Sequence, residues 1–212
     1  MIQGVFGLPG MGKSTFLTKC AMMALSGKKF MGVEPTDVVF TNFECAGCYK
    51  LDFDKLGLYN FHHCLILIDE IMLFADTRNF KTFPEHLKRF FAKHRHSRID
   101  IIWCSQYWDD CDKKIRVLTQ RFYLMEKSKL LPQITWIKPI IRAMGVSDRH
   151  MTDDYTLAAP IEWKMVYRPR YYDKFDSFDV EELPPVELIP WDPSPPLRRS
   201  GSPKGYRMGC AP

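Results

Sequence analysis

The sequence lacks any run of about 18 consecutive apolar residues, the length that a membrane-spanning helix needs. It also lacks, at its N-terminus, the order of basic, apolar and small-residue regions that marks a secretory signal. No internal repeat is visible, which excludes a repeat architecture. We therefore expect no transmembrane helix in this chain.

The sequence has seven cysteines, an odd number, at positions 20, 45, 48, 64, 104, 111 and 210. Several lie within apolar runs, so we expect free buried thiols in a reducing cytosol. Cys45 and Cys48 form a C-x-x-C pair, for which zinc binding, a redox role and free thiols in a loop are the alternatives. The net charge of +5 is compatible with a nucleic-acid or anionic-membrane partner without requiring one.

The remaining pattern predicts an α/β fold. Apolar and β-branched runs predict strands at 2–6, 38–43, 64–68, 99–104 and 122–125, and helical spacing predicts helices at 13–25, 84–93 and 113–119. Two weaker candidates, 134–141 and 161–167, would form a closing hairpin. Strands that alternate with helices indicate a central, mostly parallel sheet of about five strands with helices on both faces.

The composition changes beyond Leu183, where eight prolines are interspersed with Ser, Gly and Arg. Such a segment cannot pack a core. We predict an ATPase domain at 1–183 and a flexible proline-rich tail at 184–212.

The stretch from Gly7 to Ser14, GLPGMGKS, matches G-x-x-x-x-G-K-[ST] in full, between a predicted strand and a predicted helix. Its glycines allow the backbone to present successive N–H groups to phosphate, and the helix N-terminus adds a partial positive charge. We expect nucleotide contacts from Gly7, Gly10, Met11, Gly12, Lys13, Ser14 and Thr15. Lys13 would reach the β- and γ-phosphates, and Ser14 would hold Mg²⁺.

Two carboxylates, Asp69 and Glu70, follow the buried run LILI. Ligands of open parallel sheets bind at the carboxyl ends of strands, so these residues should lie beside the phosphate loop. We expect Asp69 to hold Mg²⁺ and Glu70 to deprotonate the attacking water. Gln106 ends the next strand and would sense the γ-phosphate or position that water, if the strand lies between those of residues 2–6 and 64–68.

Between His86 and Arg98, eight of thirteen residues are Lys, Arg or His. The segment fits a contact to nucleic acid, an arginine finger for a neighbouring subunit's nucleotide, or a solvated helix face. Arg95 is the finger candidate that we prefer, and Arg116 and Arg121 are weaker ones.

An ordered set of motifs resembles the zonula occludens toxin family, which includes the assembly ATPases of filamentous phages. The set comprises GLPGMGKST, VVFTNFE, LILIDE and the long block FFAKHRHSRIDIIWCSQYWDDCDKKIRVLTQRFY, and YRPRYYDKFDSF resembles the segment that often closes the family's ATPase domain. The resemblance covers about residues 1–126 well. Many members continue into a transmembrane helix, whereas this chain ends in the proline-rich segment.

The resemblance implies an ATP- and Mg²⁺-dependent P-loop ATPase of the FtsK/HerA-like group, working as a homo-oligomeric ring. It also implies that the protein passes single-stranded phage DNA through the inner membrane while coat subunits assemble. The partners would be that DNA and membrane-embedded assembly or coat proteins, and the location would be the host bacterial cytoplasm, at the cytoplasmic face of the inner membrane. The size and the phosphate loop leave a small P-loop kinase as one alternative. The missing membrane helix and the tail at 184–212 leave a nucleotide-gated interaction module as another.

Overall fold

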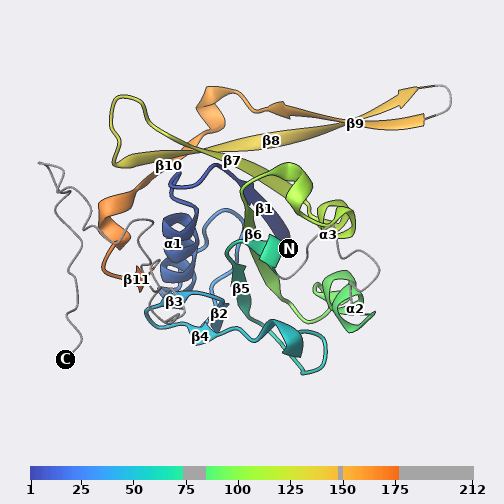
Figure 1. Cartoon of the computed structure of the whole chain (residues 1–212). Coiled ribbons are helices and arrows are strands. Elements are labelled where there is room, and N and C mark those ends of the chain that lie inside the picture. The colour runs from blue at the N-terminus through green and yellow to red at the C-terminus, as the bar shows by residue number, and fades with distance from the viewer. Residues whose placement is uncertain (74–84, 148–149, 177–212) are drawn as a thin grey trace, which may run out of the picture. The chain divides into compact units, whose positions relative to one another are not determined.

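The structure, a computed structural model, describes residues 1–73, 85–147 and 150–176. Figure 1 shows a central sheet with helices packed against it. The helices are α1 (Lys13–Leu25), α2 (Glu85–Lys93) and α3 (Lys113–Leu118). Short 3₁₀ turns interrupt the connections at Phe53–Lys55, Ile71–Leu73, Trp108–Asp110, Pro160–Glu162 and Arg168–Tyr171 (η6). The predicted boundary at residue 183 and the tail at 184–212 lie outside the described residues.

The main sheet has two parts. Its parallel part runs in the order β7-β1-β6-β5-β2-β4. β8 pairs with β7 in antiparallel orientation, and β9 and β10 each pair with β8 in the same orientation. The parallel strands are β1 (Ile2–Phe6), β2 (Val39–Thr41), β4 (Tyr49–Lys50), β5 (Leu65–Ile68), β6 (Asp100–Ser105) and β7 (Arg121–Lys127). The antiparallel strands are β8 (Ile134–Ser147), β9 (His150–Leu157) and β10 (Lys164–Tyr167).

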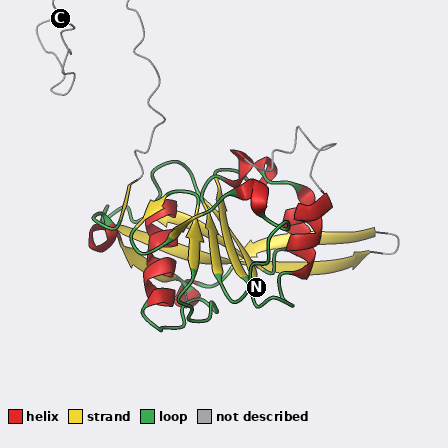
Figure 2. Cartoon of the chain, turned by 90° about the horizontal axis from the view of Figure 1, so that it is seen from below, coloured by secondary structure: helices red, strands yellow, loops and turns green. Residues whose placement is uncertain are grey.

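This arrangement confirms the predicted α/β class with a mostly parallel sheet, and it places β6 between β1 and β5. The sheet is larger than the predicted five strands because β4 adds a sixth parallel strand and the segment after residue 133 adds three antiparallel strands. β8 continues past the end of β7 and pairs with β9, from Ile140↔Leu157 to Ser147↔His150. Figures 1 and 2 show this hairpin extending beyond the rest of the sheet.

Figure 2 shows helices on both faces of the central strands, and β1, β5 and β6 are almost entirely buried. Within β5, Leu65 and Leu67 pack with the buried residues of α1, whereas Ile66 and Ile68 pack with those of α2 and α3. All four side chains are fully buried, which explains why this strand reads as one continuous apolar run. The two cores hold the carboxyl ends of β1, β5 and β6 in fixed positions beside one another.

In the described part of the chain, a second, two-stranded sheet is not paired with any strand of the main sheet. It pairs β3 (Glu44–Cys45) with β11 (Phe175–Asp176) in antiparallel orientation. Two segments about 130 residues apart in sequence, following β2 and η6, are thereby joined.

Candidate functional site

The glycine loop connects β1 to the first turn of α1. Gly12 is the N-cap residue and has a φ of 90°, in the left-handed region. No side chain caps the helix N-terminus. The N–H groups of the first turn therefore remain available to an anion, which the partial positive charge of the helix end also attracts.

Lys13 is folded over the loop that it belongs to. Its ammonium donates to the carbonyl oxygen of Gly7 at 2.8 Å and lies 3.6 Å from Oε1 of Glu70. Its side chain is 6% exposed, so the charge sits in a largely dehydrated site where it interacts strongly with other charges. A phosphate in the loop would replace these contacts with contacts to its own oxygens.

Ser14 and Asp69 meet across the site. The Ser14 hydroxyl donates to Oδ2 of Asp69 at 2.5 Å. Asn42, which follows β2, makes two hydrogen bonds to the backbone of Asp69. Nδ2 of Asn42 donates to the Asp69 carbonyl at 2.8 Å, and Oδ1 of Asn42 accepts from the Asp69 N–H at 2.7 Å. Burial raises the pKa of the Asp69 carboxyl, and the bond from Ser14 opposes that rise. A divalent cation between these oxygens would favour the ionised carboxylate, so the donor set fits Mg²⁺.

Glu70 and Gln106 form a second pair. The Gln106 amide donates to Oε1 of Glu70 at 3.2 Å, from the loop after β6. Glu70 has a φ of 48°, an uncommon backbone conformation for a residue other than glycine. Its Oε2 atom is buried without a hydrogen-bond partner. One oxygen of Glu70 is therefore held by protein groups while the other is free to accept a proton.

The loop is supported from its other side by the antiparallel strands. The hydroxyl of Thr135, a fully buried residue of β8, donates to the carbonyl of Met11 at 2.9 Å. A β-carbon on Gly12 would lie 2.9 Å from that hydroxyl oxygen and 2.8 Å from Cδ of Arg168. The backbone N–H of Lys127, the last residue of β7, donates to the Met11 sulfur at 3.4 Å. The conformation of the loop thus depends on residues more than 110 positions later in the chain.

A cavity of about 970 Å³ opens at the loop. One part is lined by loop residues 9, 10 and 12–15 together with Glu70 and Arg168, and the other by residues 44–46 and 172–176. Every predicted loop contact except Gly7 and Met11 lines it. The Gly7 carbonyl and the Met11 backbone instead fix Lys13 and Thr135.

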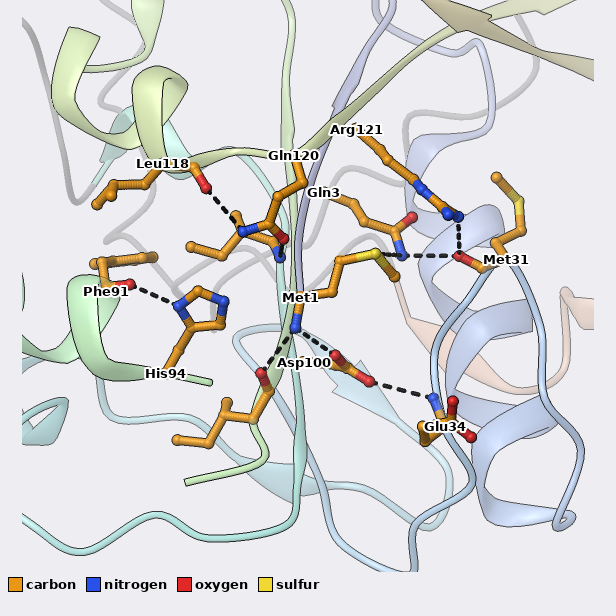
Figure 3. A network of polar contacts seen from close by, with 12 residues as sticks. Met1, Gln3, Met31, Glu34, Phe91, His94, Asp100, Leu118, Gln120 and Arg121 are labelled. Carbon is orange, nitrogen blue, oxygen red and sulfur yellow. Dashed lines mark hydrogen bonds and ion pairs between the residues drawn. The ribbon is translucent and has the colours of Figure 1, made fainter. Parts of the chain in front are cut away.

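The structure places Arg95 away from this cavity. It is an exposed residue of the turn between α2 and β6, at the edge where the parallel strands begin. Figure 3 shows the neighbourhood of this edge, where the Met1 amine bonds to Asp100 at 2.6 Å and His94 bonds to the Phe91 carbonyl at 2.7 Å. Because the phosphate loop lies at the opposite edge, Arg95 cannot reach the nucleotide site of its own chain.

The two weaker finger candidates are held by contacts within the chain. Arg121 lies near the Met31 carbonyl at the same edge as Arg95, with 3.5 Å between the atoms (Figure 3). Arg116 donates to the Trp108 carbonyl and to the Asp109 carboxylate, both at 3.1 Å. Both guanidinium groups therefore make contacts within their own chain.

Of the C-x-x-C pair, Cys45 lines the cavity and Cys48 does not. Cys45 and Cys48 are free thiols, and hydrogen bonding from Cys48 lowers the pKa of Cys45. Within residues 1–73, 85–147 and 150–176, no group of three or more His, Cys, Asp or Glu residues is placed to hold a metal ion. In the same ranges, no helix has both the length and the apolar character that crossing a bilayer requires.

Solved structures with a similar fold were found by comparison. The N-terminal domain of zonular occludens toxin from Neisseria meningitidis is 15% identical with a TM-score of 0.47, over 82% of this chain and 98% of that chain. The structural neighbours include the family that the sequence resembles. The genome packaging NTPase B204 from Sulfolobus turreted icosahedral virus 2, in complex with ATP-gammaS, is 10% identical with a TM-score of 0.49, over 65% of this chain and 91% of that chain. The flagellar accessory protein FlaH from Methanocaldococcus jannaschii is also 10% identical, with a TM-score of 0.43, over 65% of this chain and 76% of that chain.

At such identities the likeness concerns the fold. A scan against protein-family models found no match. A sequence search of curated proteins found no match either.

The sequence alone did not indicate several residues that shape the site. Asn42 could have been predicted as a site residue from its position, because it follows an apolar strand as Asp69 and Gln106 do. Thr135 had no such signal. Arg168 lies in the motif YRPRYYDKFDSF, but its place beside the loop arises only when β8 and β10 pack there.

Proposed function

We propose that this protein is an ATP-hydrolysing motor of filamentous-phage morphogenesis. The observation that carries the hydrolytic part is the convergence of Lys13, Glu70 and Gln106 at the mouth of a complete phosphate loop. A nucleotide-binding module without turnover has no need for a carboxylate that is held by an amide on one oxygen and free on the other.

ATP binding would rest on the loop itself. The loop N–H groups and the α1 N-terminus would hold the β- and γ-phosphates, and Lys13 would turn from the Gly7 carbonyl towards them. Ser14 and Asp69 would hold Mg²⁺ between their oxygens, and the ion would neutralise charge on the phosphates. Asn42 would keep Asp69 in place by its two backbone contacts.

Glu70 would then act on water. Its unpartnered Oε2 would accept a proton from a water molecule lined up with the γ-phosphorus. Gln106 would fix the carboxylate and, through it, the position of that water. Both residues follow buried strands, so the rigid sheet supports the geometry.

The motor role rests on the resemblance of the block from Phe90 to Tyr123. We infer a homo-oligomeric ring in which Arg95, exposed at the far edge of one subunit, reaches the nucleotide of the next. The proposed partners are single-stranded phage DNA and membrane-embedded assembly or coat proteins, and the proposed location is the cytoplasmic face of the host inner membrane.

The first test is the substitution Glu70→Gln, which removes the base while keeping the shape of the side chain. We expect turnover of ATP to fall by roughly 10²- to 10⁴-fold, with ATP binding retained. Glu34→Gln is the matched control, because Glu34 is 61% exposed and pairs with Lys29 away from the cavity. ATP hydrolysis should be measured with and without single-stranded DNA. Wild-type turnover in Glu70→Gln would refute the assigned mechanism, and indifference to DNA would count against the motor role.

A further inference from the structure

The cavity at the phosphate loop has a second part that the phosphates do not explain. Its wall consists of residues 44–46 and 172–176, which come from β3, β11 and the turn before β11. The wall is built as a unit, since Phe175 pairs with Cys45 in the small sheet and the Ala46 N–H donates to the Lys174 carbonyl at 2.8 Å. A bound triphosphate would occupy the loop, so this wall would face the group that is attached to the triphosphate.

Charge divides the cavity along its length. The loop part carries the cations Lys13 and Arg168 beside the single carboxylate of Glu70. The far part carries three carboxylates, Glu44, Asp173 and Asp176, and one ammonium, Lys174, which pairs with Asp173 at 2.9 Å. An acidic wall repels phosphate and accepts hydrogen bonds from hydroxyl and amino groups. The division therefore suits a ligand that is anionic at one end and rich in donors at the other.

An aromatic ring is presented on this wall. Tyr172 lines the cavity, and its side chain remains 53% exposed. Its backbone is fixed by a turn in which the Lys174 N–H donates to the Tyr171 carbonyl at 3.1 Å, and Tyr171 is itself buried. Phe175 also lines the cavity and packs against the core on the α1 side. Tyr172 thus offers an open aromatic face at a position that the fold determines.

We propose that this wall is the nucleoside subsite, in which the base stacks on Tyr172 and the carboxylate-rich rim accepts hydrogen bonds from ribose hydroxyls or base amino groups. This inference rests on the proposed function, because it needs the triphosphate in the loop. It assigns a binding role to the segment from Arg168 to Asp176, which follows the last strand of the main sheet.

The test separates the two ends of the ligand by using two probes. Binding of the non-hydrolysable ATP analogue adenylyl imidodiphosphate and of inorganic tripolyphosphate, each with Mg²⁺, should be measured by calorimetry on the full chain. For Tyr172→Ala we expect the affinity for the analogue to fall about tenfold, the scale of one base–aromatic stack, and that for tripolyphosphate to stay unchanged. Tyr172→Phe should bind both probes as the wild type does. Tyr167→Ala is the matched control, because Tyr167 is 52% exposed on the adjoining strand β10 and does not line the cavity.

Each other outcome overturns the inference. Equal affinity of Tyr172→Ala and the wild type for the analogue would remove the stacking role. Equal losses for both probes would show that Tyr172 supports the phosphate loop and not the nucleoside, which removes the stacking role. A wild type that binds tripolyphosphate as tightly as the analogue would leave no nucleoside subsite, while leaving the proposed function intact. A wild type that binds neither probe would refute the proposed function together with the inference.

Discussion

The substitution Gly12→Ala tests whether the antiparallel strands fix the phosphate loop. Gly12 has a φ of 90°, and a β-carbon there would lie 2.8 Å from Cδ of Arg168 and 2.9 Å from Oγ1 of Thr135. The substitution therefore combines an unfavourable backbone conformation with a steric conflict on the side of β8 and η6.

Two other glycines allow these costs to be separated. Gly27 has a φ of 73°, and a β-carbon there would have no atom within 4 Å. Gly10 has a φ of 74°, and a β-carbon there would have only the Lys127 ammonium nearby, at 3.8 Å. Gly27→Ala and Gly10→Ala should each lower the free energy of unfolding by about 1 kcal/mol, since a left-handed conformation costs about 1–2 kcal/mol and alanine also restricts the unfolded chain.

Gly12→Ala should cost more than either control. Thr135 can move away only by giving up its bond to the Met11 carbonyl, which adds about 1 kcal/mol, and overpacking adds about 1–3 kcal/mol. We expect a total loss of about 3 kcal/mol in urea unfolding, together with weaker ATP binding that Gly27→Ala does not show. A loss in Gly12→Ala that equals the loss in Gly27→Ala would refute the claim that β8 and η6 hold the loop.

Two further predictions concern the far edge of the sheet. Burial lowers the pKa of His94, whose Nδ1 bonds to the Phe91 carbonyl and whose Nε2 is buried without a partner, so the folded protein holds the neutral ring. Its contribution to stability should be complete above about pH 6.5 and decline as the pH falls below that value, by at most about 1.4 kcal/mol per pH unit. The free energy of unfolding in urea should differ less between pH 7.5 and pH 5.5 in His94→Asn than in the wild type. The same pH difference in both proteins would contradict this prediction. Mixing inactive Arg95→Ala with inactive Glu70→Gln should restore ATP hydrolysis, because some sites would then combine an intact Glu70 with a neighbour's intact Arg95; no recovery would exclude the trans finger.

The parallel part of the fold could be predicted because its signals are local. The strand 64–68 is a continuous apolar run, since both of its faces are buried, and the helix 13–25 follows the glycine loop with apolar residues at helical spacing. These patterns require no knowledge of distant contacts. The order of the strands then follows the usual topology of open α/β sheets, in which the polar ends of neighbouring strands meet.

The antiparallel part was harder to predict because charged and polar residues interrupt its apolar pattern. The strand candidate 134–141 stopped six residues short of the end of β8, and β9 was not predicted at all. Their sequences contain charged and polar residues such as Arg142, Asp153 and Asp154, which break any apolar run. What holds them in place is the backbone pairing between β8 and β9, which composition does not reveal.

The same antiparallel part changes how the nucleotide site should be understood. Thr135 of β8 fixes the Met11 carbonyl, and Arg168, directly after β10, lies against Gly12 and lines the cavity. The chain then turns through Tyr172 into β11, which closes the far wall of the same cavity. A nucleotide in this cavity would therefore contact both the glycine loop and the segment that pairs with β3. Any change that a nucleotide causes in the loop has a direct structural route to β8, β10 and β11.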